Sequence, residues 1–165
     1  DGSVSDRAKM VSELMAAAGF KSPILEDIRA EIWLKLWGNM TFNPISALTH
    51  GHLEGICQHP LTKDLARNMM AEAQTIGEKL GVTFRVDIER RIGGAEKVGK
   101  HKTSMLQDIE QGKALELDAL LGSVIELGYI VGIATPTLHT VHNLCLLLQQ
   151  SVLRSGHGLS LMAKE

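Results

Sequence analysis

The segment that most constrains the fold is the run from Ile32 to Phe42, which reads IWLKLWGNMTF. Seven of its residues are large and apolar, and at helical spacing they surround the whole circumference of a helix. Such a helix must be covered on most sides by other elements. The sequence therefore predicts a central helix from about residue 27 into the forties, which Pro44 is expected to kink or end.

The rest of the chain also has helical periodicity, with apolar residues three and four apart between capping residues and glycines. Thr62 is expected to cap one helix, and Gly128 to end another. We expect helices over residues 6–18, 62–80, 87–98, 104–111, 116–127 and 136–154, an extended linker at 82–86 and a frayed tail at 156–165. The connection at 50–60 is expected to hold at most one short helical turn. No segment alternates with the period of two typical of strands, so the predicted fold class is all-α.

Length and charge restrict the kind of protein. At 165 residues the chain is the size of one domain, so residues 1–165 are taken as a single helical domain. Its 17 basic and 19 acidic residues give a net charge of −2, and neither sign forms a long block. We therefore expect no nucleic acid and no anionic membrane surface as partner. Charged or polar groups interrupt every apolar stretch before it is long enough to cross a bilayer.

The cysteine content favours a reducing compartment. Cys57 and Cys145 are too few for a disulfide scaffold in a chain of this length. We expect both to be small core residues. The predicted location is cytoplasmic.

Three polar residues on the predicted central helix share one face. Lys35, Asn39 and Asn43 are spaced by four, which places them on a narrow line along about 12 Å of helix. Buried polar groups need partners. Two interpretations remain open at this point: Lys35 extends to solvent while the asparagines bind neighbouring backbone, or the line faces a cleft whose small polar ligand supplies the partners.

Several ordered motifs carry a resemblance to a known family. They are EIWLKLWGN from Glu31, NPISAL from Asn43, TSMLQD from Thr103 and ELD from Glu116. Together they closely resemble the C-terminal domain of ketopantoate reductases, in order over about residues 1–156. The resemblance implies an all-helical substrate domain similar to that of 6-phosphogluconate dehydrogenase. It also implies an NADPH-dependent enzyme that reduces the small 2-keto acid 2-dehydropantoate to pantoate in pantothenate synthesis.

The resemblance assigns roles to five residues. Lys35 matches the catalytic lysine that protonates the carbonyl oxygen, and Glu116 matches the acid that contacts this lysine and the hydroxyl end of the substrate. The ammonium is expected in a mostly apolar interior. The residues that match the substrate pocket are Asn39, Asn43 and Ser104, with the Ser104 hydroxyl on the substrate carboxylate. Read without the resemblance, Ser104 is a helix cap and Glu116 an ordinary carboxylate at a helix start.

The chain also departs from the family pattern. His101 stands where the family has an asparagine, and residues 51–53 offer no amide to the ligand. No Gly-x-Gly-x-x-Gly follows a strand, so the N-terminal dinucleotide-binding domain that would bind most of the NADPH is expected to be missing from this chain. The start at Asp1 resembles a cut through a longer protein, and this fragment alone is expected to be inactive. No metal site is expected, because the histidines at 50, 52 and 59 lack carboxylates or thiolates at a characteristic spacing.

A second interpretation is a stand-alone helical interaction module without catalysis. Trp33 and Trp37 would then bind a partner helix, whereas in the enzyme they are core anchors or contacts for the missing domain. About 150 upstream residues in the parent gene, with a glycine-rich turn, would favour the enzyme. A homodimer through the helical domain is compatible with either interpretation.

Overall fold

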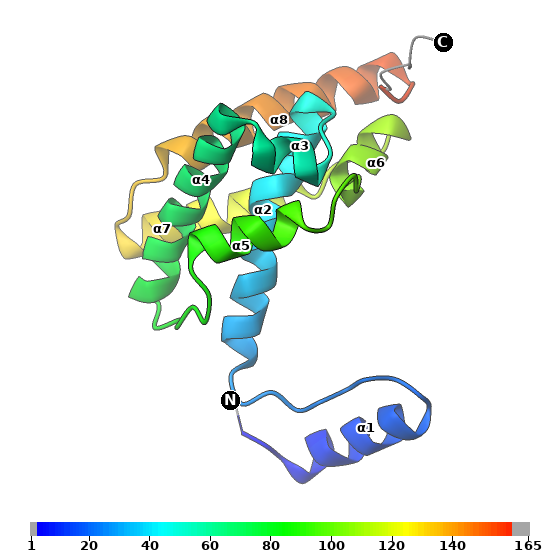
Figure 1. Ribbon diagram of the computed structural model, residues 1–165, viewed down its shortest axis with the longest axis vertical. Helices are drawn as coiled ribbons and strands as arrows, with labels where there is room; N and C mark the ends of the chain where they lie inside the picture. The colour runs from blue at the N-terminus through cyan, green and yellow to red at the C-terminus, as the bar shows by residue number, and fades with distance from the viewer. Residues whose placement is uncertain (1–2, 160–165) are drawn as a thin grey trace.

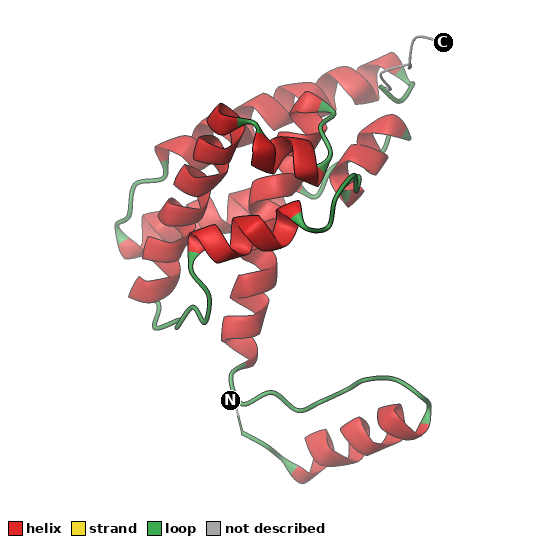
Figure 2. Cartoon of the chain, viewed as in Figure 1, coloured by secondary structure: helices red, strands yellow, loops and turns green. Residues whose placement is uncertain are grey.

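The computed structural model describes residues 3–159, and its regular structure over that range is entirely helical (Figure 2). The elements are α1 (Asp6–Ala17), α2 (Ile28–Thr49), α3 (Leu53–Gln58), α4 (Pro60–Lys79), α5 (Ile88–Glu96), α6 (Ser104–Glu110), η1 (Asp118–Gly122), α7 (Ser123–Val131) and α8 (Pro136–Ser155). No strand occurs among these described residues, and the predicted all-α fold class is confirmed. Over the same range, no helix combines the length and apolarity needed to span a membrane.

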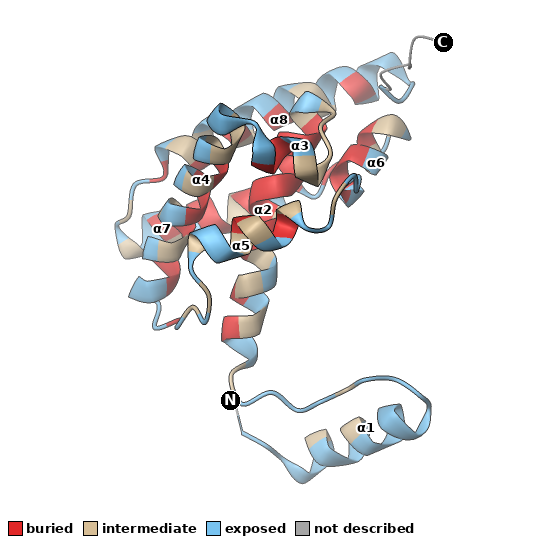
Figure 3. Cartoon of the chain, viewed as in Figure 1, coloured by how far each residue is buried: buried red, intermediate tan, exposed pale blue. Residues whose placement is uncertain are grey.

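Helix α2 runs through the middle of the helical body and contacts α4, α6 and α8 (Figure 1). Between Trp37 and Ala47, every residue except Asn39 is buried. The first turns of α2 project from the body, and there Ile28 and Ile32 are 49% and 56% exposed (Figure 3). The prediction of a covered central helix is therefore confirmed for the second half of α2 and wrong for its start.

Pro44 was expected to kink or end α2, and it does not end the helix. The helix continues to Thr49 and ends at His50, which takes up a left-handed conformation with φ +54°. A proline inside a helix costs about 3 kcal/mol because it removes one backbone hydrogen bond and crowds the preceding turn. The residues on both sides of Pro44 are buried, and their packing offsets that cost.

The connection before α4 is more helical than expected. Six of its residues form α3, which exceeds a single turn. Helix α4 begins at Pro60, and its cap is His59 rather than Thr62, because His59 Nδ1 accepts the backbone N–H of Thr62 at 3.4 Å. Proline at a first helical position is favourable, since no intrahelical hydrogen bond is lost there.

Gly128 lies inside α7 instead of ending a helix. An added Cβ at this position would come within 3.0 Å of the Ile133 carbonyl oxygen and 3.3 Å of Ile76, so the glycine allows close packing. The helix ends after Val131, and Gly132 takes the left-handed conformation there with φ +73°. Before α7, η1 is a single π-helical turn in which the N–H of Ser123 donates to the carbonyl of Asp118.

The predicted tail turns back on the domain. Gly156 ends α8 in a left-handed conformation with φ +68°, and the N–H of Leu159 then donates to the Ile109 carbonyl on α6 at 3.0 Å. The expectation of a frayed end is therefore wrong for residues 156–159. Residues 160–165 lie outside the described range.

The two tryptophans belong to the core. Trp37 is fully buried, and its Nε1 donates to the Met70 carbonyl on α4 at 2.7 Å. Phe84 lies in the irregular segment between α4 and α5, which confirms the predicted linker, and its ring centroid is 4.6 Å from that of Trp37. Gly77 admits this ring, since a Cβ there would meet Phe84 at 2.8 Å. Trp33 also packs edge-on against Phe84, so neither tryptophan is free for a partner.

Both cysteines are buried and free, as predicted. Burial raises the pKa of Cys57 to about 11 and that of Cys145 to about 12. Thiols with such pKa values are almost entirely protonated at neutral pH and are poor nucleophiles.

Helix α1 stands apart from the body (Figure 1). Ser5 caps it by accepting the N–H of Ala8, and none of its residues is buried. Its apolar residues, including Met10 and Leu14, are exposed. Among the described residues, the compact part of the chain therefore begins with α2.

Glu72 on α4 holds the start of α8. Its Oε1 and Oε2 accept the backbone N–H groups of Thr137 and Leu138 at 2.8 and 3.0 Å. A carboxylate at a helix N-terminus is also favoured by the helix dipole. We expect Glu72→Ala to lower the free energy of unfolding by about 1–3 kcal/mol, because two part-buried backbone donors lose a charged acceptor. Urea denaturation checks this, with the exposed Glu78→Ala as the control; equal losses in both variants would contradict it.

Candidate active site

The structure brings three of the five predicted site residues to one hollow. Asn39 and Asn43 from α2 and Ser104 from α6 line a cavity of about 320 Å³. Asn43 is buried, and its Nδ2 lies 3.5 Å from Ser104 Oγ, to which it donates. The hollow thus presents an amide and a hydroxyl side by side, which suits a small ligand rich in oxygen atoms.

Thr103, and not Ser104, caps α6. The Thr103 hydroxyl accepts the N–H of Leu106 at 3.3 Å, and Ser104 is the first helical residue. The interpretation of Ser104 as a helix cap is therefore wrong. Its hydroxyl makes no cap bond and lies at the hollow instead.

The two positions that depart from the family pattern also meet this hollow. His101 and Leu53 both line it. The backbone holds them together, because the N–H of Leu53 donates to the His101 carbonyl at 3.2 Å. An imidazole and an isobutyl group therefore line the hollow at positions where the family pattern has amides. The hollow offers a ligand fewer neutral polar groups than that pattern would.

Lys35 lies in an adjoining hollow of about 400 Å³ between α2 and α5. Its side chain is exposed, so the expectation of an ammonium in a mostly apolar interior is wrong for the described chain. The reason is its place on the projecting first turns of α2, which the other helices within residues 3–159 do not enclose. The lysine is thus open on the side away from the helical body.

Glu116 is not part of either hollow. It precedes the π-helical turn η1, is exposed, and forms no hydrogen bond or ion pair with Lys35 within residues 3–159. The predicted contact between acid and lysine is therefore not seen in this structure. Its backbone carbonyl accepts the N–H of Leu120, so Glu116 leads into the helix without being a side-chain cap.

Arg91 is a site residue that the sequence did not indicate. It lies on α5, is half-buried, and lines both hollows. Burial lowers the pKa of its guanidinium from the ordinary value. Its neighbour Arg90 is exposed, and nothing in the local sequence distinguishes the two arginines.

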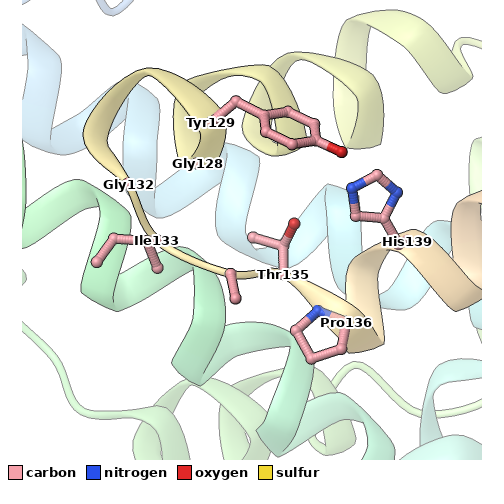
Figure 4. Close-up of a pocket in the computed structure, with 8 residues that line it drawn as sticks. Gly128, Tyr129, Gly132, Ile133, Thr135, Pro136 and His139 are labelled. Carbon is pink, nitrogen blue, oxygen red and sulfur yellow. The ribbon is translucent and has the colours of Figure 1, made fainter.

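A further hollow of about 430 Å³ lies at the turn between α7 and α8 (Figure 4). The rings of Tyr129 and His139 pack edge-to-face there, with centroids 5.7 Å apart. The remaining lining residues are glycines, Ile133, Ala134, Thr135 and Pro136, and no acidic residue, lysine or arginine contributes. This hollow lacks a charged group that could stabilise a developing alkoxide. Elsewhere in the described part of the chain, no three histidine, cysteine or acidic side chains converge as metal ligands.

Comparison with known proteins identifies the family. The model of the ketopantoate reductase PanE/ApbA C-terminal domain matches residues 27–149, a range that contains all five predicted site residues and Arg91. The chain belongs to the ketopantoate reductase C-terminal family. The match begins at the start of α2, so α1 lies outside it.

Individual relatives agree with this membership. A 2-dehydropantoate 2-reductase of Mesorhizobium japonicum is 54% identical over 140 residues, which are 85% of this chain and 43% of the relative. A solved structure from Ralstonia solanacearum MolK2, provisionally named a ketopantoate reductase, is 39% identical with a TM-score of 0.86 and shares 91% of this chain and 46% of its own. This chain thus spans less than half the length of these two relatives.

A more distant structure shares the fold alone. D-mandelate dehydrogenase with NADH and anilino(oxo)acetate aligns with a TM-score of 0.81 at 19% identity, over 90% of this chain and 65% of its own. The helical arrangement therefore persists where little of the sequence does.

Proposed function

We propose that this chain is the substrate-binding part of an NADPH-dependent enzyme that reduces 2-dehydropantoate to pantoate in pantothenate synthesis. The observation that carries the proposal is the hollow of Asn39, Asn43 and Ser104 beside Lys35, inside the range that the family model matches. The part of the relatives that this chain does not span would contain the dinucleotide-binding domain. A cytoplasmic location fits such a role.

The residues of this chain fit the substrate side of such a reaction. They offer amide and hydroxyl groups to a small ligand, and no glycine-rich turn follows a strand within residues 3–159. NADPH, when bound by the other domain, supplies a hydride to the carbonyl carbon. Lys35 lies on the open start of α2, where another domain can approach.

Lys35 has the chemistry that carbonyl reduction requires. Hydride addition breaks the π bond of the carbonyl, and its electron pair moves to the oxygen, which becomes an alkoxide. The ammonium stabilises this charge and transfers a proton to the oxygen, which leaves a hydroxyl group on the product and a neutral lysine. The lysine then regains a proton from solvent. Ser104 and the two asparagines hold the carboxylate and hydroxyl groups of the substrate meanwhile.

The decisive experiment measures NADPH oxidation by the full-length protein. A panel of short branched 2-keto acids is offered as substrates, and NADH replaces NADPH in a parallel series. We expect the highest kcat/KM for 2-dehydropantoate with NADPH. If no 2-keto acid supports oxidation, this proposal is wrong.

Glu116 provides a further test in the full-length protein. If the assembled protein brings this acid against Lys35 and the substrate, Glu116→Gln will raise KM and lower kcat, because both a contact and a charge partner are lost. Steady-state kinetics and a thermal melt are measured on the same preparation. A change in thermal stability alone would return Glu116 to a purely structural role at the start of η1.

A stand-alone interaction module has less support. That interpretation needs the tryptophans at a surface, and both are buried against Phe84. The family match also covers the central helix and both hollows.

A further inference from the structure

Arg91 carries a positive charge that nothing in the described chain neutralises. Its guanidinium forms neither a hydrogen bond nor an ion pair with any residue of the range 3–159, although the side chain is half-buried. Arg67 and Arg85 are paired with acids, Arg67 with Asp64 and Glu89, and Arg85 with Glu31 at 3.0 Å. Within the same range, the arginines at 7, 29, 90 and 154 form no such pair but are exposed to solvent, whereas Arg91 is half-buried. A partly buried charge without a partner is costly and is characteristic of binding sites.

The sequence makes room for this side chain at Gly38. An added Cβ on Gly38 would lie 1.8 Å from Nη2 of Arg91 and 2.7 Å from its Cζ, so the guanidinium lies directly on the bare backbone of α2. Gly38 falls between Lys35 and Asn39 in the sequence, on the segment that lines both hollows. Any other residue at position 38 would displace the arginine from this place.

We propose that Arg91 binds the carboxylate of the 2-keto acid, together with Ser104. This inference rests on the proposed function and adds a recognition residue to it. A guanidinium and a carboxylate pair through two parallel hydrogen bonds, which fixes both the position and the orientation of the acid. Arg91 faces the same hollow as Ser104 and His101, so it supplies a strong donor where the family amide at 101 is missing.

The charges around Arg91 favour an anion. Lys35 and Arg90 line the adjoining hollow, and its one acid, Glu31, is already paired with Arg85. The thiol of Cys57 is near enough to interact electrostatically with Arg91, but it stays protonated because burial raises its pKa to about 11. No acidic residue lines the Asn39–Ser104 hollow itself.

The first test replaces Arg91 with glutamine in the full-length protein, which keeps most of the side-chain length and removes the charge. The KM for 2-dehydropantoate is expected to rise at least tenfold, while the KM for its methyl ester changes less than twofold, because the ester has no anionic carboxylate. Lys97→Gln at the end of the same helix is the control, and its exposed ammonium lines neither hollow. Equal effects on acid and ester would overturn the proposal.

Gly38→Ala tests the same idea while the arginine stays in the chain. The new methyl group must push the guanidinium off α2, so the KM for the acid is expected to rise as in Arg91→Gln. Alanine is a better helix former than glycine, so the melting temperature should not fall. A folded Gly38→Ala variant with an unchanged KM for the acid would contradict the assigned position of Arg91.

Binding of sodium pantoate, measured by calorimetry on the same proteins, separates this inference from the reductase proposal. One outcome is that pantoate binds the wild-type protein at least tenfold more tightly than the Arg91→Gln variant, while the wild-type protein reduces no 2-keto acid. This outcome would support the arginine site and contradict the proposed reaction. If reduction is normal and pantoate binds both proteins with equal affinity, Arg91 does not bind the carboxylate, and the proposed reaction is still supported. Absence of pantoate binding in the wild-type protein also overturns the carboxylate site.

Discussion

Replacing Lys35 with alanine in the full-length protein is expected to lower kcat by about 100- to 10,000-fold, the usual contribution of a proton donor. The alkoxide would then have to take its proton from water, without a nearby positive charge to stabilise it. The fold should be unaffected, because the side chain is exposed on the projecting start of α2. Steady-state NADPH oxidation with saturating 2-dehydropantoate measures the effect.

The matched control for this variant is Lys79→Ala, which removes another exposed ammonium from the last turn of α4. Its kcat should stay within twofold of the wild-type value. A near-normal kcat in Lys35→Ala would show that Lys35 is not the proton donor. Because this outcome leaves pantoate binding untouched, it can be told apart from a failure of the Arg91 site.

Trp37→Ala is expected to have the largest effect on stability, a loss of about 3–5 kcal/mol in the free energy of unfolding. The indole is fully buried between α2 and α4, and its removal leaves a large cavity beside Phe84. The Met70 carbonyl also loses its indole donor. Since domains are stable by only about 5–15 kcal/mol, the variant should be close to unfolding at ambient temperature.

Urea denaturation followed by circular dichroism measures this loss. Leu61→Ala is the control, because Leu61 is 74% exposed and its truncation should change stability by less than about 0.5 kcal/mol. A loss below about 1 kcal/mol for Trp37→Ala would contradict the central place of α2 in the core.

The helices could be predicted because apolar spacing and capping residues are local signals. The start of α2 shows the limit of such signals. Ile28 and Ile32 have the apolar pattern of a covered helix, yet no described element covers them, because periodicity says that a face is apolar and not what lies against it. Gly128 shows the same limit, since a glycine that ends a helix and one that admits a close neighbour look alike in sequence.

The candidate site was predictable only where family motifs mark it. Asn39, Asn43 and Ser104 do share a hollow, as the resemblance implied. Arg91 was missed because a charged pair on a short helix is typical of a solvated surface. Its role depends on the packing of α5 over Gly38, and a relationship between residues 53 positions apart leaves no local pattern.

The direction in which Glu116 points depends on the number of residues in the π-helical turn before α7. A turn of this kind arises from one residue more than a regular helix would hold, so loss of a single residue between Asp118 and Gly122 would restore ordinary winding. The segment upstream would then rotate by about 100° about the helix axis relative to α7. In this chain, a one-residue deletion in the π turn can therefore change the direction in which Glu116 points, with no change in its chemistry.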